Sequence, residues 1–169
     1  MEISTVAFFP RHSRLTVRFR HQLYSSQIPE LAGKLLVTLP SLREHLCTNR
    51  SGLPFTDELQ DTELGHVFEH VMLAVLHQRG LAARGQTTWN WNRDPIGTYH
   101  VTISTGKRLL VKESMLIAQA ILTNALLGPA IRFHLPSKAP DPELPVFVHP
   151  ARRLLFAADA APERRKARW

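Results

Sequence analysis

The sequence predicts an α+β domain in which a small, largely antiparallel sheet carries helices on one face. Three observations lead to this expectation. The 169 residues are 44% hydrophobic and 21% charged, which is typical of one globular domain. Residues 14–21 alternate strictly between apolar and polar side chains, as a half-buried strand does. Along the chain the patterns run strand, strand, helices, strand, strand, helix, an order that favours an α+β fold.

The first 24 residues contain two predicted strands. A turn at residues 10–13 separates them, and in the second strand the residues that alternate with the apolar ones are polar or basic. One face of this strand is therefore expected to pack on the core and the other to meet solvent. The apolar positions are Ile3, Val6 and Phe8 in the first strand and Leu15, Val17 and Phe19 in the second.

Residues 29–47 contain leucines at helical spacing. Pro40 divides this segment into two short helices, because proline fits the first turn of a helix and breaks its interior. Residues 48–57 are rich in Thr, Asn, Ser, Gly, Pro and Asp, so they predict a loop.

A central helix is predicted over residues 61–79. Asp61 or Thr62 is expected to cap its N-terminus and Gly80 its C-terminus. Two further strands are expected at 86–91 and 98–104, joined by a turn-forming segment that contains Asn, Asp, Pro and Gly. A final helix over 112–127 ends where Gly128-Pro129 follows.

The charge and proline content change near residue 136. Residues 136–150 contain five prolines, which predict an extended connection, with 146–148 or 154–156 as candidate edge strands. Residues 151–169 carry four of the seven net positive charges, which leaves the rest of the chain nearly balanced. The sequence thus predicts a domain over 1–135 and a proline-rich connection with a basic tail over 136–169. A solvated tail of this kind is weak support for a third interpretation, nucleic-acid binding.

The single cysteine, Cys47, excludes an intramolecular disulfide framework. A reducing, cytoplasmic location is therefore expected. The longest apolar stretch, 115–127, falls short of the ~20 residues of a membrane span. Residues 1–10 also lack the basic start of a signal peptide, so no membrane partner is expected.

The central helix contains the motif H-x-x-E-H at residues 66–70. Histidines four positions apart lie about one turn apart on one helix face, so both rings can reach a single Zn²⁺. Glu69 lies beside them and can accept a proton from a water molecule that the ion activates. His77 lies ~16 Å along the helix from His66, too far to share the ion, and is expected to be exposed.

A site with two histidines needs a third protein ligand. The candidates are Cys47, His45, Glu63, His100 and Glu113. Cys47 is preferred because the following loop can fold it beside the metal helix, and one Cys with two His forms a known catalytic zinc set. Glu113 is the alternative, since pitrilysin-type inverzincins take their third ligand from a downstream Glu. On chain order alone, Cys47 could equally be a small core residue.

Three segments resemble the N-terminal domain of cyanophycin synthetase. They are LPSLREHLC at 39–47, LGHVFEHV at 64–71 and GTYHV at 97–101, and they match in order, spacing and content over roughly residues 1–130. That family builds a polymer with an aspartate backbone and arginine on each side chain, using an ATP-grasp domain and a Mur-ligase-like domain. Neither domain is found in these 169 residues, so the chain is not expected to polymerise.

The resemblance implies a site as well as a fold. Some members of the family carry a metallopeptidase-like centre that cuts cyanophycin into primers. By position, Cys47, His66 and His70 match its metal-binding residues and Glu69 its catalytic acid/base. Because the polymer presents carboxylates and guanidinium groups together, the expected substrate-binding residues are Arg18 and Arg20 for the carboxylates and Glu63 for a guanidinium.

Two functions are the leading expectations. The first is a zinc-dependent amide hydrolase that acts on cyanophycin or a related Asp/Arg polymer. The second is a noncatalytic domain that binds the polymer or docks onto a separate cyanophycin synthetase, and it needs no metal. The zinc content of the purified protein and the effect of replacing Glu69 on activity therefore distinguish the two functions.

Overall fold

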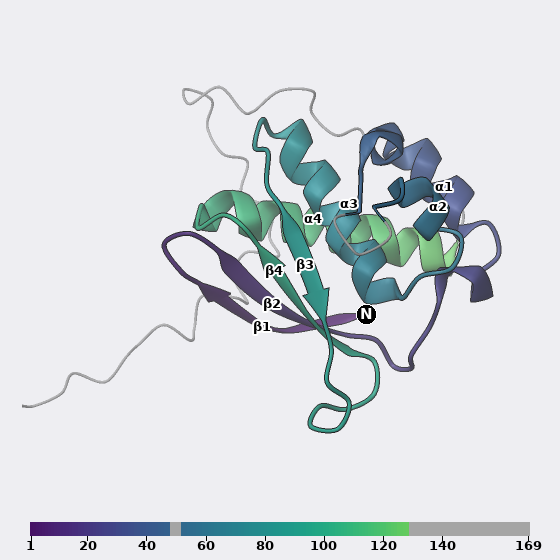
Figure 1. The fold of residues 1–169 in the computed structure, drawn as a ribbon, viewed down its shortest axis with the longest axis horizontal. Coiled ribbons are helices and arrows are strands. Elements are labelled where there is room, and N and C mark those ends of the chain that lie inside the picture. Colours follow the sequence, from purple (N-terminus) through teal and green to yellow (C-terminus); the bar gives the residue numbers. More distant parts are fainter. Residues whose placement is uncertain (48–51, 129–169) are drawn as a thin grey trace, which may run out of the picture. The chain divides into compact units, whose positions relative to one another are not determined.

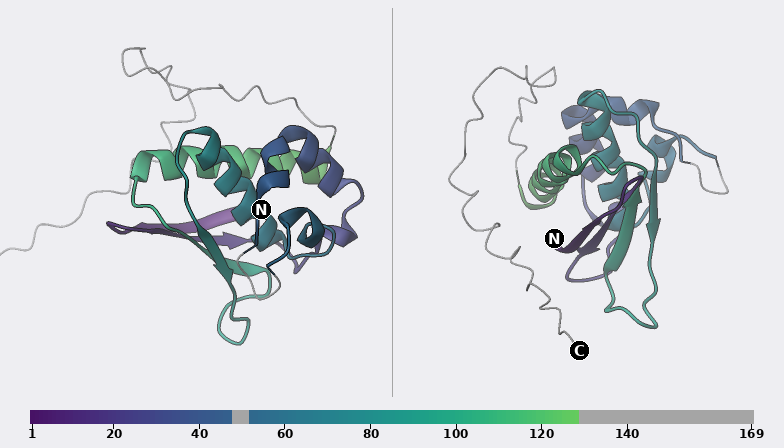
Figure 2. Two further views of the ribbon diagram at one scale, coloured as in Figure 1. Left: turned by 45° about the horizontal axis from the view of Figure 1, so that its top comes forward. Right: turned by 90° about the vertical axis from the view of Figure 1, so that its left-hand side faces the viewer.

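The computed structural model describes residues 1–47 and 52–128. A four-stranded antiparallel sheet with the order β1-β2-β4-β3 forms one layer, and helices cover one of its faces (Figures 1 and 2). This arrangement confirms the predicted α+β class. The strands are β1 (Glu2–Phe8), β2 (Ser13–Arg18), β3 (Gly85–Thr88) and β4 (Thr98–Ile103).

The two inner strands, β2 and β4, build the core face of the sheet. Leu15 and Val17 of β2 are fully buried, while Arg14 and Arg18 are exposed, as the alternating pattern predicts. In β4 the residues opposite Val17 and Leu15 are Tyr99 and Val101, and they are buried as well. The predicted alternation therefore sets both the register and the face that meets the helices.

Four α-helices are present in the described part of the chain, together with two 3₁₀ segments. Their bounds are η1 (Ser25–Gln27), α1 (Leu31–Thr38), η2 (Pro40–Glu44), α2 (Phe55–Glu58), α3 (Leu64–Gln78) and α4 (Arg108–Leu127). Pro40 opens η2 as predicted, but η2 ends at Glu44, so Cys47 does not end a helix and follows in an extended segment. The short helix α2 lies where only a loop was expected, and α4 begins four residues earlier than predicted.

The start of α3 differs from the prediction. Its N-cap residue is Glu63, and neither Asp61 nor Thr62 holds that position. The Thr62 hydroxyl, which could have capped the helix, instead lies 3.0 Å from Nδ1 of His66. It contacts the imidazole ring rather than the backbone of the first helical turn. At the other end Gly80 has a φ of 74°, and its N–H donates to the carbonyl of His77. This left-handed residue terminates the helix as predicted.

Helix α3 is the core helix of the domain. Eleven of its fifteen residues are buried, and it packs against β3, β4 and α4. Gly65 permits this close packing, because a Cβ at that position would overlap with the ring of Tyr99 in β4. The residues of the H-x-x-E-H motif are therefore held between the sheet and the other helices.

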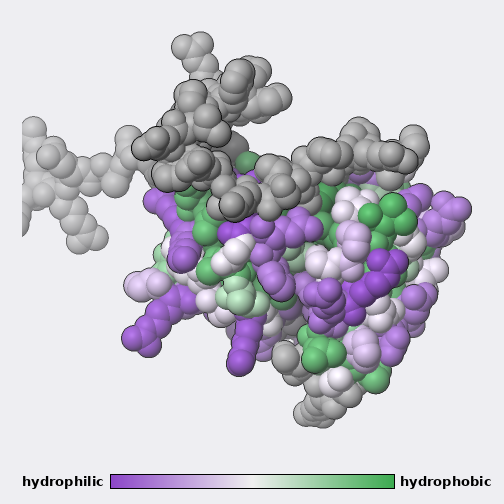
Figure 3. All heavy atoms as spheres, turned by 90° about the horizontal axis from the view of Figure 1, so that it is seen from above, coloured by the Kyte–Doolittle hydropathy of each residue, from purple (hydrophilic) through white to green (hydrophobic). Residues whose placement is uncertain are grey.

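Helix α4 is long and apolar enough to span a membrane by length and composition alone. In this domain it packs against α1 and α3 and buries Val111, Ala118, Ile121 and Leu122. Seen from above, the described residues that are visible in Figure 3 show hydrophilic and hydrophobic side chains intermixed. The packing of α4 on the domain accounts for part of its apolar surface, while Leu109, Leu116 and Leu127 stay exposed.

The predicted proline-rich connection and basic tail, residues 136–169, lie outside the described residues. The candidate edge strands at 146–148 and 154–156 lie there too. The division between 135 and 136 stays a prediction.

Replacing Gly65 by alanine should destabilise the domain by about 1–3 kcal/mol, the usual cost of overpacking a core. The matched control is Gly33→Ala in α1, where nothing lies within 4 Å of an added Cβ. That change should be neutral or stabilise by up to ~1 kcal/mol, because alanine favours a helix interior. Chemical denaturation of both variants tests this, and equal effects would show that α3 does not pack on Tyr99 as described.

Candidate metal centre

Cys47, His66 and His70 point their ligand atoms at one place. These atoms all lie within 4.8 Å of one another. The Cys47 sulfur is 3.7 Å from Nε2 of His66 and 3.5 Å from Nε2 of His70. In a tetrahedral zinc site with Zn–S at ~2.3 Å and Zn–N at ~2.0–2.1 Å, a sulfur and a nitrogen ligand lie about 3.5 Å apart. The three residues thus lie close enough to bind one metal ion, as the sequence predicted.

Local structure explains how the thiol reaches the helix. His66 and His70 are one turn apart on α3, and Cys47 comes from the extended segment that follows η2. Two backbone hydrogen bonds fix this segment, from the N–H of Phe55 to the carbonyl of His45 at 2.9 Å and from the N–H of Cys47 to the carbonyl of Leu53 at 3.0 Å. The Cys47 side chain is consequently buried, with 3% of the residue exposed.

Each histidine of the set has a partner on the ring nitrogen that faces away from the thiol. Thr62 Oγ1 lies 3.0 Å from Nδ1 of His66, and Nδ1 of His45 lies 3.2 Å from Nδ1 of His70. With Nε2 used as a metal ligand, each Nδ1–H donates to that partner, which fixes tautomer and ring orientation. Phe55 also stacks on His70 with ring centroids 3.8 Å apart.

Glu69 is held next to the ligand set but is not part of it. Its Oε2 accepts a hydrogen bond of 2.5 Å from the Thr87 hydroxyl on β3, and only 5% of the residue is exposed. Gly85 makes room for the carboxylate, because a Cβ there would lie 2.5 Å from Oε1. The site therefore contains a fixed carboxylate beside three ligand atoms.

Burial shifts the protonation of these groups toward neutral forms. Burial, with further contributions from His66 and His45, lowers the pKa of His70 to about 2, and burial lowers the pKa of His66. Burial raises the pKa of Glu69 to about 7 and, with Glu58 and Glu69 nearby, that of the Cys47 thiol to about 12. Neutral imidazoles are ready to bind a metal, whereas the thiol must lose its proton when a cation binds.

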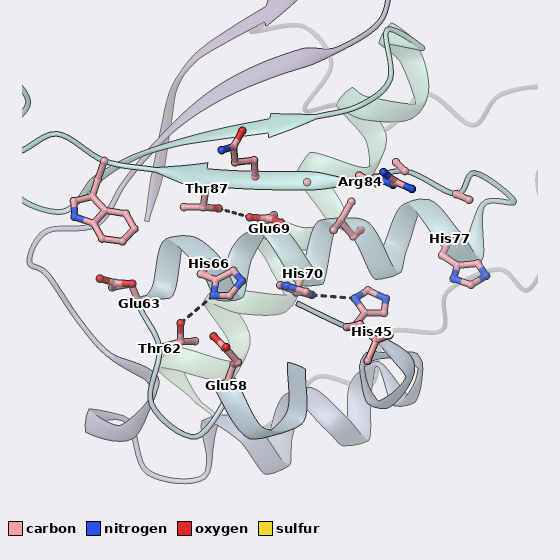
Figure 4. Close-up of a pocket in the computed structure, with 17 residues that line it drawn as sticks. His45, Glu58, Thr62, Glu63, His66, Glu69, His70, His77, Arg84 and Thr87 are labelled. Carbon is pink, nitrogen blue, oxygen red and sulfur yellow. Dashed lines mark hydrogen bonds between the residues drawn. The ribbon is translucent and has the colours of Figure 1, made fainter. Parts of the chain in front are cut away.

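The site opens into a pocket of about 760 Å³ between α3 and β3. His66, His70 and Glu69 lie at its middle (Figure 4). Glu63 lies toward the N-terminal end of α3, and Arg84, His77 and His45 lie toward its C-terminal end. Trp89, which follows the end of β3, also lines the pocket. A substrate can therefore approach the ligand atoms from solvent.

The other residues considered from the sequence lie in different places. Glu113 is paired with Arg79 at 3.8 Å, and His100 contacts Asp94 and Thr16 on the sheet face that points away from α3. His77 is exposed, as predicted.

The two arginines expected to bind substrate are not among the residues that line this pocket. Arg18 on β2 and Arg20 just beyond it are exposed and alternate with buried Val17 and Phe19. They do not line the pocket, whereas Glu63 does.

Four supporting residues were not identified from the sequence as parts of the site: Thr62, Phe55, Gly85 and Thr87. Thr62 lies four positions before His66, a helical spacing that could have suggested the contact. Thr87, Gly85 and Phe55 reach the site through tertiary packing, and no local pattern marks them.

A family model of the cyanophycin synthase-like N-terminal domain matches residues 14–126, a range that includes the three ligand residues and Glu69. The chain belongs to this family. No curated protein matches the chain. Membership confirms the resemblance and links this cyanophycin synthase-like N-terminal domain to cyanophycin metabolism.

Thr62→Val should weaken zinc binding by about 10–100-fold, the usual effect of removing the partner of a ligand histidine. Valine keeps the shape of threonine but cannot accept the Nδ1–H of His66. Competition with a chromogenic chelator measures the change. Thr102→Val, on the opposite face of the sheet, serves as the control and should bind zinc like the parent, and unchanged affinity in Thr62→Val would remove Thr62 from the site.

The metal-free domain should lose stability as the pH falls below about 6.5. The unfolded chain protonates His70 near pH 6.5, but the folded chain keeps it neutral down to about pH 2. Between these values a proton binds only the unfolded chain, so acidification lowers the free energy of unfolding. His66 and His45 act in the same direction. Glu69 opposes them, because its raised pKa gives stability that is lost as the pH rises through about 7.

Thermal melts in chelator at pH 7 and pH 5 measure this dependence. The parent should melt lower at pH 5, and His70→Gln should reduce the difference, since glutamine does not titrate. An equal difference in the parent and the variant would contradict the burial of a neutral His70.

Proposed function

We propose that this domain is a zinc-dependent amide hydrolase that cleaves cyanophycin or a related Asp/Arg polymer. One observation carries the proposal. The thiol of Cys47 and the Nε2 atoms of His66 and His70 converge, and beside them lies the Glu69 carboxylate, which Thr87 holds by a hydrogen bond. Family membership supports the class of substrate. The pocket supplies access for an extended chain.

The donor set favours zinc among the available ions. Cys47 offers a soft sulfur, and His66 and His70 offer two imidazole nitrogens, a combination that suits zinc and leaves a fourth position open. A zinc ion held there supplies polarisation of the amide carbonyl and a more acidic water. The ligand thiol requires a compartment that keeps it reduced, as the cytoplasm does.

Glu69 performs the proton transfers. Its carboxylate accepts a proton from the attacking water as the new C–O bond forms, and it then gives that proton to the nitrogen as the C–N bond breaks. Burial, which raises the pKa of Glu69, favours a group that can return the proton as well as accept it. The hydrogen bond from Thr87 keeps the carboxylate in place through both steps.

A noncatalytic domain that binds polymer or docks onto a synthetase is the alternative. Family membership alone fits it equally well. A noncatalytic domain has no use for the Glu69 carboxylate, because a residue that is only 5% exposed cannot contribute to a surface contact. Burying this carboxylate also raises the free energy of its charged form. The buried carboxylate therefore favours hydrolysis.

Glu69→Gln should keep zinc and lose at least ~100-fold in turnover, the usual scale for removing a general base. Release of short fragments from purified cyanophycin, with and without a chelator, measures activity, and elemental analysis measures zinc. Glu113→Gln, at the ion pair with Arg79, is the matched control and should retain both. Full activity in Glu69→Gln would refute the mechanism, and loss of zinc would make Glu69 a ligand.

A further inference from the structure

We propose, on the basis of the proposed function, that Glu63 and Trp89 form a guanidinium-binding subsite at one end of the pocket, and that Arg84 at the other end receives a carboxylate. The pocket would then hold its substrate in one direction across the site of cleavage. Glu63 would thereby act as a specificity-determining residue.

Glu63 lies toward the N-terminal end of α3 in Figure 4, and both Glu63 and Trp89 line the pocket. Glu63 is the N-cap residue of α3 and is half-buried, so its backbone is held at the start of the helix, and its carboxylate makes no capping hydrogen bond. Trp89 follows β3, and its ring packs against those of Tyr99 and Trp91 with centroids 6.2 Å and 5.9 Å away. The residue is still 44% exposed, which leaves surface for a ligand.

A carboxylate and an exposed indole that line one pocket fit a guanidinium better than any other common cation. The planar group can donate two parallel hydrogen bonds to the carboxylate while its face stacks on the aromatic ring. A lysine ammonium is a compact, strongly hydrated charge and makes neither contact as well. The pair therefore selects arginine over lysine, and strongly over a neutral side chain.

The opposite end of the pocket has the opposite charge. Arg84 lies there with His77 and His45 (Figure 4). Its backbone N–H donates to the Ser104 hydroxyl at 2.7 Å, which fixes the chain at that point. Among the described residues the Arg84 guanidinium makes no ion pair, and its side chain is exposed. It is therefore available to a carboxylate of the substrate.

The rings of His66 and His70 and the Glu69 carboxylate lie between these two ends (Figure 4). A bound chain would thus place the cleaved amide between a guanidinium held at Glu63 and a carboxylate held at Arg84. An Asp/Arg polymer offers both groups along its length, so it can satisfy both ends of the pocket at once.

Binding of two matched oligomers tests the subsite. The probes are an N-acetylated aspartate trimer with arginine on each side chain and the same trimer with citrulline, which has the shape of arginine without its charge. Calorimetry with zinc-loaded Glu69→Gln protein measures affinity. The arginine trimer should bind about tenfold or more tightly than the citrulline trimer, the usual effect of a charge-assisted hydrogen bond.

Adding Glu63→Gln should remove most of this preference while the citrulline trimer binds as before, and Trp89→Leu should reduce it. Asp61→Asn, which removes a nearby exposed charge outside the pocket, is the matched control and should keep the preference. Arg84→Gln should weaken both trimers equally. Equal binding of the two trimers, no binding of either, or a preference that survives Glu63→Gln would overturn the subsite. If the arginine trimer is preferred but the parent protein does not cleave cyanophycin, the result would contradict the proposed hydrolysis and still support the subsite.

Discussion

The close packing of α3 against the sheet is the constraint on which the site depends. Gly65 lets the helix approach Tyr99, and Gly85 lets the Glu69 carboxylate approach β3. With a larger residue at either place the helix would move outward, and Thr87 would lose its contact with Glu69. The same packing buries most of α3, so Glu69 and His70 are largely shielded from water and the pocket is the side from which solvent reaches the motif. Fold and chemistry thus depend on the same two glycines.

Burial of polar groups explains why a cation is expected at this site. A neutral thiol and neutral imidazoles gather where ionisation is disfavoured, and such groups cost free energy in an interior unless they find partners. Thr62 and His45 contact the outer nitrogens of His66 and His70, and the inner nitrogens lie 3.7 Å and 3.5 Å from the sulfur of Cys47. A bound cation offsets that cost for all three atoms, so metal binding should also stabilise the fold.

Local periodicity in the sequence predicted most of the fold and the placement of His66 and His70 on one face of a helix. The strands around Leu15 and Val17, the α+β order and the pair His66 and His70 were all predictable, because alternation and helical spacing are properties of neighbouring residues. The supporting groups were not predictable, because Thr87 and Phe55 reach the site only after strands and helices pack. The ends of the helices were the hardest features to predict. The Thr62 hydroxyl, for example, could cap the backbone of α3 or contact the ring of His66, and in the structure it contacts the ring.

X-ray absorption at the zinc edge of the purified protein tests the centre most directly. A site built from Cys47, His66 and His70 predicts one sulfur at ~2.3 Å and nitrogen or oxygen neighbours at ~2.0–2.1 Å. The sulfur contribution should vanish in Cys47→Ser while the nitrogen contribution persists. A parent spectrum without sulfur, or protein that holds no zinc at all, would contradict the account of this metal centre.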